Sequence, residues 1–224
     1  MKQTLVLAVV VCGWLGAATA APPAGQEEFE FKDGKWVPAT EPVEGTEQGH
    51  LALIRKLIER GEGRSALRAT KRFFKVYPDS PRREEALLLA GRAEIVRERY
   101  WQAFEWLEEQ LAEYPAGRYY EWALSREFEV AEAFLAGKKR IHFGIFRLRA
   151  EGDGLDILLR IAEHAPGTTI AQKAMLRIAD HQYEKARFAE AVAAYDEFLE
   201  MFPKSAQAQY AALQAARSTH AQFQ

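Results

Sequence analysis

The residue types that most often carry chemistry are few in this chain, and their spacing matches no catalytic or metal-binding motif. The histidines are His50, His142, His164, His181 and His220. None stands in the His-Glu-x-x-His spacing that places two imidazoles on one helix face. Asp180 and His181 are adjacent, so on a helix their side chains point in different directions. Neighbouring acids such as Glu108 and Glu109 are typical of a solvent-facing helix surface.

Glycine-rich phosphate loops and reactive thiols are also missing from the sequence. Gly61, Gly63, Gly152 and Gly154 are spaced like turn residues, and Cys12 is the only cysteine. We therefore predict that the protein is not an enzyme and that it binds no metal and no cofactor. A hydrolase is the alternative, and it would require histidine and acidic residues to meet in one pocket of the fold. The formal net charge of −2 gives no reason to expect a nucleic-acid partner.

Residues 1–20 predict a secretory signal peptide. A lysine follows the first methionine, residues 5–15 are almost all apolar, and the small residues Ala18 and Ala20 precede an expected cleavage site before Ala21. The apolar run is shorter than the roughly 20 residues that a membrane span needs, so an uncleaved anchor is only the alternative. We expect an exported protein.

Cys12 lies inside this apolar run rather than after it, and three valines precede it. A lipoprotein signal needs a small residue just before the modified cysteine. We therefore expect Cys12 to be removed with the signal peptide, and lipidation is the alternative. The chain that remains has no thiol and can form no disulfide, so its stability must come from packing.

Residues 21–49 are rich in Pro and Glu, which is typical of a tether. Within them, the alternating Phe29 and Phe31, an Asp-Gly dipeptide and Trp36 predict a small hairpin with a tight turn. Because an isolated hairpin is marginal in water, we expect its aromatic side chains to lie against the rest of the protein. A strand that binds a partner is the alternative.

From residue 51 onward the apolar residues recur every three or four positions, which predicts amphipathic helices. The clearest apolar stripe consists of Phe188, Ala191, Val192, Tyr195, Phe198, Leu199 and Phe202. A helix with one apolar face cannot bury that face alone, so these helices must pack against one another.

Proline residues follow the predicted helices at regular intervals. Pro78 and Pro115 are 37 residues apart, as are Pro166 and Pro203, and the interval between the middle two is 51. Proline cannot continue a helix, and we expect the small or polar residues after each proline to cap the next one. A unit of about 37 residues with two helices predicts an all-α, right-handed superhelical solenoid of helix hairpins. A non-repeating helical bundle is the alternative.

The period places about 4.5 repeats over residues 50–224. The predicted helix pairs are 50–60 with 63–77, 82–97 with 100–113, 119–136 with 153–164 and 169–185 with 187–201, and a single helix over 205–222 follows them.

The residues within each unit resemble the tetratricopeptide repeat. In the second unit the matching residues are Gly91, Tyr100, Ala103 and Pro115, and in the fourth they are Ala179, Phe188, Ala191, Tyr195, Phe198 and Pro203. In tetratricopeptide solenoids the first helix of each pair lines the concave surface. The resemblance therefore implies a partner-binding surface that includes Arg92, Ile95, Lys173, Asp180 and Tyr183.

The third unit is longer than the others because of an insertion at about residues 137–150. It combines basic and aromatic residues and has a high propensity for strands. Three interpretations stay open: a loop that packs on the solenoid, a docking element for a protein, or a contact with anionic lipid or another polyanion. The candidate docking residues are Lys138, Lys139, Arg140, Phe143 and Phe146.

The region from residue 51 to the end resembles the BamD (YfiO) family, the helical-repeat component of the outer-membrane β-barrel assembly machinery. Residues 189–199 and 202–206 match best. The resemblance implies a scaffold at the periplasmic face of the outer membrane, with partners among the envelope proteins and indirect membrane contact. The alternatives are a periplasmic adaptor of the Tol–Pal cell-division type, which CpoB represents, and a general peptide-binding adaptor.

Overall fold

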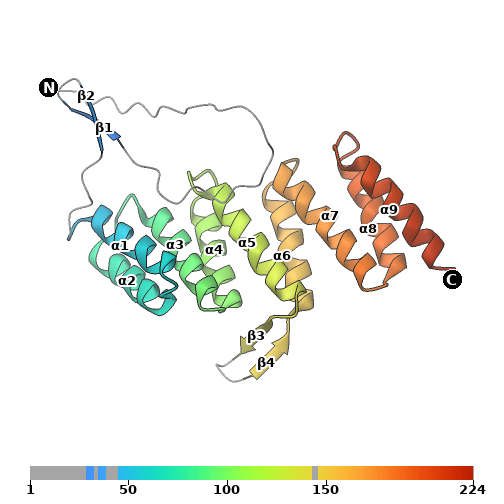
Figure 1. The fold of residues 1–224 in the computed structure, drawn as a ribbon, viewed down its shortest axis with the longest axis horizontal. Coiled ribbons are helices and arrows are strands. Elements are labelled where there is room, and N and C mark those ends of the chain that lie inside the picture. The colour runs from blue at the N-terminus through green and yellow to red at the C-terminus, as the bar shows by residue number, and fades with distance from the viewer. Residues whose placement is uncertain (1–28, 33–34, 39–44, 143–145, 224) are drawn as a thin grey trace.

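The computed structural model describes residues 29–32, 35–38, 45–142 and 146–223, with side chains for residues 45–140 and 148–223. Nine α-helices succeed one another in this part of the chain (Figure 1). They are α1 (Glu47–Glu59), α2 (Gly63–Val76), α3 (Arg83–Val96), α4 (Tyr100–Glu113), α5 (Tyr120–Leu135), α6 (Glu151–His164), α7 (Thr169–Glu184), α8 (Phe188–Met201) and α9 (Ala208–Ala221). The predicted helices and their pairing are confirmed, with ends that differ by at most three residues.

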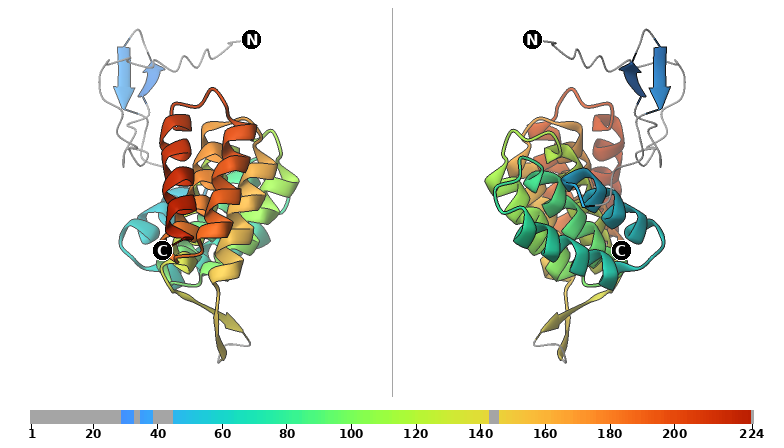
Figure 2. Two further views of the ribbon diagram at one scale, coloured as in Figure 1. Left: turned by 90° about the vertical axis from the view of Figure 1, so that its right-hand side faces the viewer. Right: turned by 90° about the vertical axis from the view of Figure 1, so that its left-hand side faces the viewer.

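The helices form a solenoid. Each helix packs against the next one in the chain, from α1 through to α9. The odd-numbered helices also touch one another, α1 with α3, α3 with α5 and α5 with α7. Figure 1 shows the pairs following one another along the long axis, and the end-on views of Figure 2 show the two layers that the odd and even helices make. The solenoid of tetratricopeptide-like hairpins, with four pairs and a fifth first helix, is therefore confirmed for the described residues.

The buried apolar side chains form two neighbouring clusters, one over α1 to α3 and one from α3 to α9. Phe73, Leu87 and Leu107 are fully buried toward the first helices, and Phe134 and Tyr195 are buried toward the last. Small residues let the helices approach closely enough for this. At Gly91, an added Cβ would come within 2.9 Å of the Leu107 side chain, so α3 and α4 could not pack as they do with any larger residue there.

The predicted capping of the next helix by a small or polar residue after each proline is correct at one helix and wrong at two others. Thr168 does cap α7, because its hydroxyl accepts the N–H of Ala171 at 3.3 Å. Ser80 and Ser205 do not cap helices. Ser80 Oγ accepts the Arg82 N–H at 3.1 Å, inside a turn that precedes α3. An extra turn after the proline therefore delays the helix.

These serine hydroxyls instead connect neighbouring repeats. Ser80 lies 3.0 Å from a carboxylate oxygen of Glu47 at the start of α1, and Ser205 lies 2.8 Å from Oε1 of Gln172 in α7. Each hydroxyl donates to a polar residue at the same position of the preceding repeat. The contact is absent at the two middle junctions, where the equivalent residues are Gly117 and Thr168, and the Thr168 hydroxyl donates to the Ala165 carbonyl instead.

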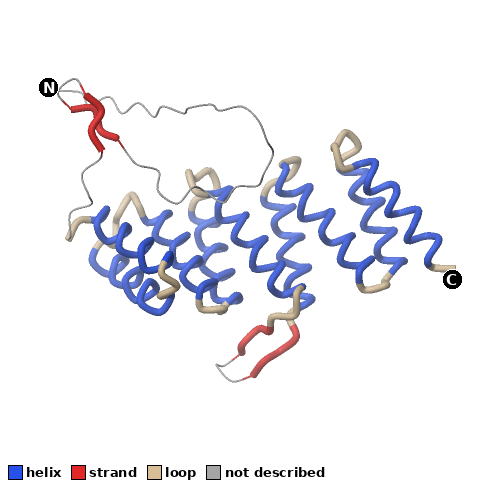
Figure 3. The backbone as a smooth tube through the Cα atoms, viewed as in Figure 1, coloured by secondary structure: helices blue, strands red, loops and turns tan. Residues whose placement is uncertain are grey.

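Two short strand pairs accompany the helices (Figure 3). Strands β1 (Phe29–Lys32) and β2 (Lys35–Pro38) pair antiparallel with Lys32 opposite Lys35, in the segment where the sequence suggested a hairpin. Strands β3 (Lys139–His142) and β4 (Phe146–Arg149) form a second antiparallel pair inside the predicted insertion. The expected contacts of Phe29, Phe31 and Trp36 lie outside the described side chains.

Candidate functional site

The surface along the odd-numbered helices is built from one repeated position. Counting from Arg92 by the repeat intervals of 37 and 51 residues gives a charged residue in every unit. These residues, which we call the groove position, are Arg55, Arg92, Glu129, Asp180 and Arg217. Arg55, Glu129 and two further groups on the same helices, Glu59 and Arg126, are the charges that act on Arg92. The first three units of this row therefore lie together on one face.

A second repeated position, which we call the facing position, contacts the groove position of the preceding unit in two places. Arg55 in the first unit forms an ion pair with Glu85 in the second. Asp180 in the fourth unit accepts the hydroxyl of Tyr210 in the fifth at 2.9 Å. Glu85 and Tyr210 stand at the same repeat position, and the two other members of this facing position are Trp122 and Lys173.

Arg92 has no ion pair, unlike three other arginines on the odd-numbered helices. Arg55 is paired with Glu85, Arg126 lies 2.7 Å from Glu129, and Arg177 lies 2.6 Å from Glu132 on the neighbouring helix. No carboxylate of the described residues lies within 4.0 Å of Arg92. The register explains this, because the facing position opposite Arg92 holds Trp122 instead of an acid.

The electrostatics of Arg92 follow from this position. Burial lowers the pKa of the half-buried guanidinium from its ordinary value, and Arg126 lowers it further. Glu59 and Glu129 oppose that shift from a distance. The site therefore holds a partly desolvated cation that a carboxylate from a partner could satisfy directly.

Trp122 supplies an exposed apolar surface at the facing position of the next unit. Its side chain is 47 % exposed, and its ring meets that of Tyr119 edge-on, with centroids 5.5 Å apart. Exposed tryptophan and arginine are the residue types that most often anchor protein interfaces. Residue-by-residue reading of the sequence missed Trp122, Arg55 and Arg217, although the repeat intervals locate all three.

The other residues predicted for the concave surface have mixed surroundings. Lys173 is exposed on α7, at the facing position. Ile95 and Tyr183 are partly buried against the core, and the Tyr183 ring packs edge-on against Phe188 at 5.6 Å. Arg92 and Lys173 are therefore the more available of these four side chains.

Asp180, the fifth predicted residue, is held by two tyrosines. Its Oδ1 atom accepts the hydroxyl of Tyr195 at 2.6 Å and that of Tyr210 at 2.9 Å. Burial raises the pKa of Tyr195, and the hydrogen bond to Asp180 raises it further. Asp180 thus joins α7, α8 and α9 at the end of the solenoid.

The insertion is attached to the solenoid at its base. The Arg140 guanidinium lies over the Trp101 ring, 3.3 Å from its centroid, and 3.4 Å from Asp153. Lys138 forms an ion pair with Glu98 at 2.7 Å. Lys139 is exposed. Phe143 and the side chain of Phe146 lie outside the described part.

The histidines are dispersed through the described structure. His181 is buried and lies 3.0 Å from Glu151, whose carboxylate also contacts Arg187 at 2.9 Å. His164 lies 3.4 Å from Glu108, more distant than a good hydrogen bond. Within the described residues, no three His, Cys, Asp or Glu side chains gather as a metal site would require. None of the described helices combines the length and the apolar character of a membrane span.

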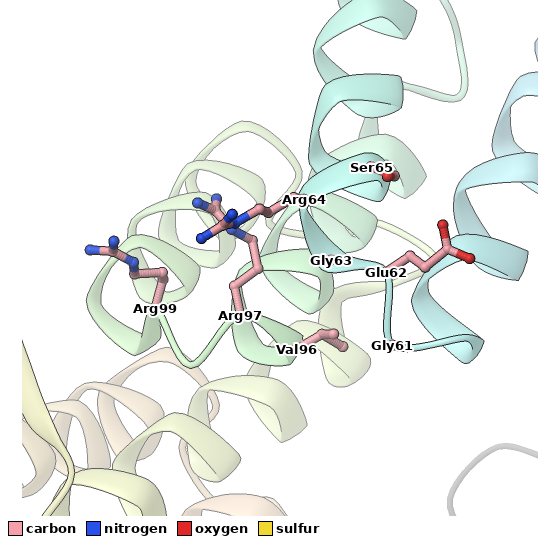
Figure 4. Close-up of a pocket in the computed structure, with 8 residues that line it drawn as sticks. All are labelled: Gly61, Glu62, Gly63, Arg64, Ser65, Val96, Arg97 and Arg99. Carbon is pink, nitrogen blue, oxygen red and sulfur yellow. The ribbon is translucent and has the colours of Figure 1, made fainter.

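Two shallow hollows open on opposite edges of the solenoid. One, of about 360 Å³, lies between the α1–α2 and α3–α4 turns, and its lining includes Arg64, Arg97 and Arg99 (Figure 4). The other, of about 370 Å³, lies around the α4–α5 turn and is lined by Arg118 and Glu121 among others.

Comparison with known proteins finds repeat proteins of distant sequence. No protein-family model and no curated protein matches the chain. A solved structure of Podosopora anserina putative kinesin light chain, with nearly identical TPR-like repeats, is 14 % identical, covers 79 % of this chain and 86 % of its own, and gives a TM-score of 0.44. A thermophilic TPR protein of Thermus thermophilus is 20 % identical, with coverages of 80 % and 100 % and a TM-score of 0.38. Similarity at this level assigns neither a partner nor an activity.

Proposed function

We propose that this protein is a non-enzymatic scaffold that binds a segment of another protein along the odd-numbered helices. The observation that carries the proposal is Arg92, a half-buried guanidinium with no carboxylate partner among the described residues. By the repeat interval, the exposed Trp122 stands at the facing position of the next unit. A partner segment with an acidic residue next to an apolar one would pair with the cation and cover the indole.

Charge reversal at Arg92 tests this surface. We expect Arg92→Glu to weaken binding of the natural partner by about tenfold or more, because losing a partly desolvated ion pair and adding repulsion costs at least about 1.4 kcal/mol. Arg92→Gln should have a smaller effect. Arg72→Glu is the matched control, because Arg72 is exposed on α2, an even-numbered helix. Equal binding by the Arg92→Glu and Arg72→Glu proteins would overturn the proposed surface.

For the biological setting we propose a BamD-like role in outer-membrane protein assembly, after export to the periplasm. Support comes from the resemblance of the residue pattern at 189–206 to the BamD family and from the predicted signal peptide over residues 1–20. Cys12 would then not anchor the protein, since we expect it to be removed with the signal peptide. Affinity purification from the native cell should recover barrel-assembly components, and depletion should lower the level of outer-membrane proteins. Normal levels after depletion would contradict this role.

An envelope adaptor of the Tol–Pal type, or a more general peptide adaptor, is the second candidate. The absence of heptads in the Pro-rich residues 21–49 counts against the Tol–Pal type, since a coiled coil before the repeats would favour it. The same purification distinguishes the candidates, because cell-division proteins would replace barrel-assembly components among the proteins recovered.

A further inference from the structure

The charges of this protein are divided unequally between the two edges of the solenoid. The connections within helix pairs, residues 60–62, 97–99, 136–150 and 185–187, contain ten Lys or Arg residues and two Glu residues. We call this the basic edge. The connections between pairs, residues 77–82, 114–119, 165–168 and 202–207, contain three basic residues and one acid. The whole chain has a formal charge of −2, so the rest of the molecule is acidic.

Half of the cations on the basic edge are not neutralised by neighbours. Arg97, Lys138, Arg140 and Arg187 are each paired with an acid. In the described structure, no carboxylate lies within 4.0 Å of the remaining described basic side chains of the edge. These are Arg60, Arg99, Lys139, Arg149 and Lys185.

The basic edge also contains one of the two hollows. Arg64, Arg97 and Arg99 line it, and Figure 4 shows their side chains extending to one side while Glu62 extends to the other. Arg97 is paired with Glu94 at 2.8 Å. Arg64 and Arg99 have no carboxylate within 4.0 Å in the described part of the chain. The hollow thus offers cationic hydrogen-bond donors and room for a phosphate-sized group.

The β3–β4 hairpin extends the basic edge away from the helices (Figures 1 and 2). Arg140 pairs across the strands with Leu148, and Lys139 pairs with Arg149. Successive residues of a strand point to opposite faces. Since Arg140 lies on Trp101 of α4, Lys139 and Arg149 belong to the face that points away from α4. Both are exposed.

We propose that the basic edge docks this protein onto an anionic phospholipid bilayer, with the hairpin and the arginine hollow in contact with lipid headgroups. The cations are spread along the length of the solenoid rather than gathered in one groove, so they match a flat surface of many phosphates. An acidic protein segment would contact only part of such a row. Each basic residue near an anionic membrane raises its affinity by roughly fivefold, and the effect declines within a Debye length.

Vesicle binding of the full chain tests the proposal. Cosedimentation would be measured with vesicles of phosphatidylcholine alone and of phosphatidylcholine with phosphatidylglycerol, at low and high salt. The double variant Lys139→Gln/Arg149→Gln removes two free cations from the hairpin, and Arg64→Gln/Arg99→Gln removes two from the hollow. The matched control is Arg118→Gln/Lys204→Gln, which removes the same charge from the opposite edge. Circular dichroism would verify that each variant is folded.

We expect salt-sensitive binding to the anionic vesicles, and a loss of roughly 25-fold in affinity for either basic-edge variant from two charges at fivefold each. The opposite-edge variant should stay within about twofold of the parent. Equal losses in all three variants, or no preference for anionic vesicles, would overturn the proposal. Binding to polyglutamate without binding to the vesicles would also overturn it, in favour of an acidic protein partner. Groove variants such as Arg92→Glu should bind vesicles normally, so this test is independent of the proposed function.

Discussion

At the scale of single residues, the repeat shows which side chains occupy equivalent positions in successive units. Arg92 is one charged residue among many when the sequence is read locally, and it becomes the centre of a row once the 37- and 51-residue intervals are applied. Its lack of an ion pair could not be predicted in that way. It depends on the stagger between neighbouring helices, which places Trp122 where the preceding unit has Glu85.

The burial of Glu127 could not be predicted from the sequence. It reads as a surface acid on α5, yet it is fully buried and neither of its oxygens has a hydrogen-bond partner among the described residues. Burial raises its pKa well above the ordinary value, and Glu108 raises it further while Arg160 lowers it. A carboxyl whose pKa rises on folding makes the folded state less stable as the pH rises above its unfolded pKa.

We therefore predict that Glu127→Met stabilises the protein at pH 7 by about 1–3 kcal/mol and that the gain shrinks toward pH 4.5, where about half of the unfolded chains already carry the protonated carboxyl. Urea unfolding at the two pH values, followed by circular dichroism, measures both effects. Glu190→Met, at an exposed site on α8, is the control and should change little. A loss of stability at pH 7 in Glu127→Met would contradict the burial of an uncompensated carboxyl.

Gly117 and Glu84 are coupled across the second and third repeats. Glu84 Oε1 accepts the Tyr119 N–H at 2.7 Å, and a Cβ at Gly117 would collide with this carboxylate. We predict that Gly117→Ala costs about 1–2 kcal/mol, because the carboxylate must give up that hydrogen bond. In a Glu84→Ala background the cost should fall but not vanish, because the added Cβ would still come within 2.9 Å of the Tyr114 Cβ. Additive losses in the double-mutant cycle would show that the two residues are not coupled.

At the scale of elements, the helices were predictable because their apolar period and their prolines agree. Their first turns were less so, since Ser80 and Ser205 are bonded within turns and to the preceding repeat. The strand propensity of the insertion was visible in the sequence. The way its base attaches was not, because the stacking of Arg140 on Trp101 joins parts of the chain that are distant in sequence.

We predict that the β3–β4 hairpin can be removed without unfolding the solenoid. Replacing residues 137–149 with Gly-Ser keeps the buried Ala150 and removes contacts that lie at the surface. The melting temperature should change by no more than about 5 °C, since surface ion pairs contribute little. Thermal unfolding followed by circular dichroism measures this. A loss of cooperative unfolding would mean that the hairpin is part of the core.

At the scale of the whole molecule, each repeat should stabilise only the repeats next to it. Helix α9 buries Ala211 and Ala215 against the preceding pair, and Tyr210 bonds to Asp180. We predict that deleting residues 206–224 speeds amide hydrogen exchange in α7 and α8 and leaves α1 to α4 unchanged, because each repeat contacts only its neighbours. Uniform acceleration along the chain would contradict this independence.

The division of charge is also a property of the whole molecule. The formal charge of −2 does not reveal this division, because the basic residues are dispersed in the sequence. They come together at one edge because successive helices run in opposite directions. The helix pattern predicted the solenoid, and the solenoid is what places the turns within pairs along a common edge. Partner identity depends on surface details that the repeat leaves free to vary.

Photo-crosslinking in the native cell tests the central claim, that the odd-numbered helices hold a protein partner, most directly. A benzophenone amino acid would replace the exposed Trp122 and, as the control, the exposed Met201 on α8. We predict a defined protein adduct from position 122, its loss when Arg92→Glu is added, and none from position 201. Equal adducts from both positions, or an adduct at position 122 that Arg92→Glu leaves intact, would contradict the account.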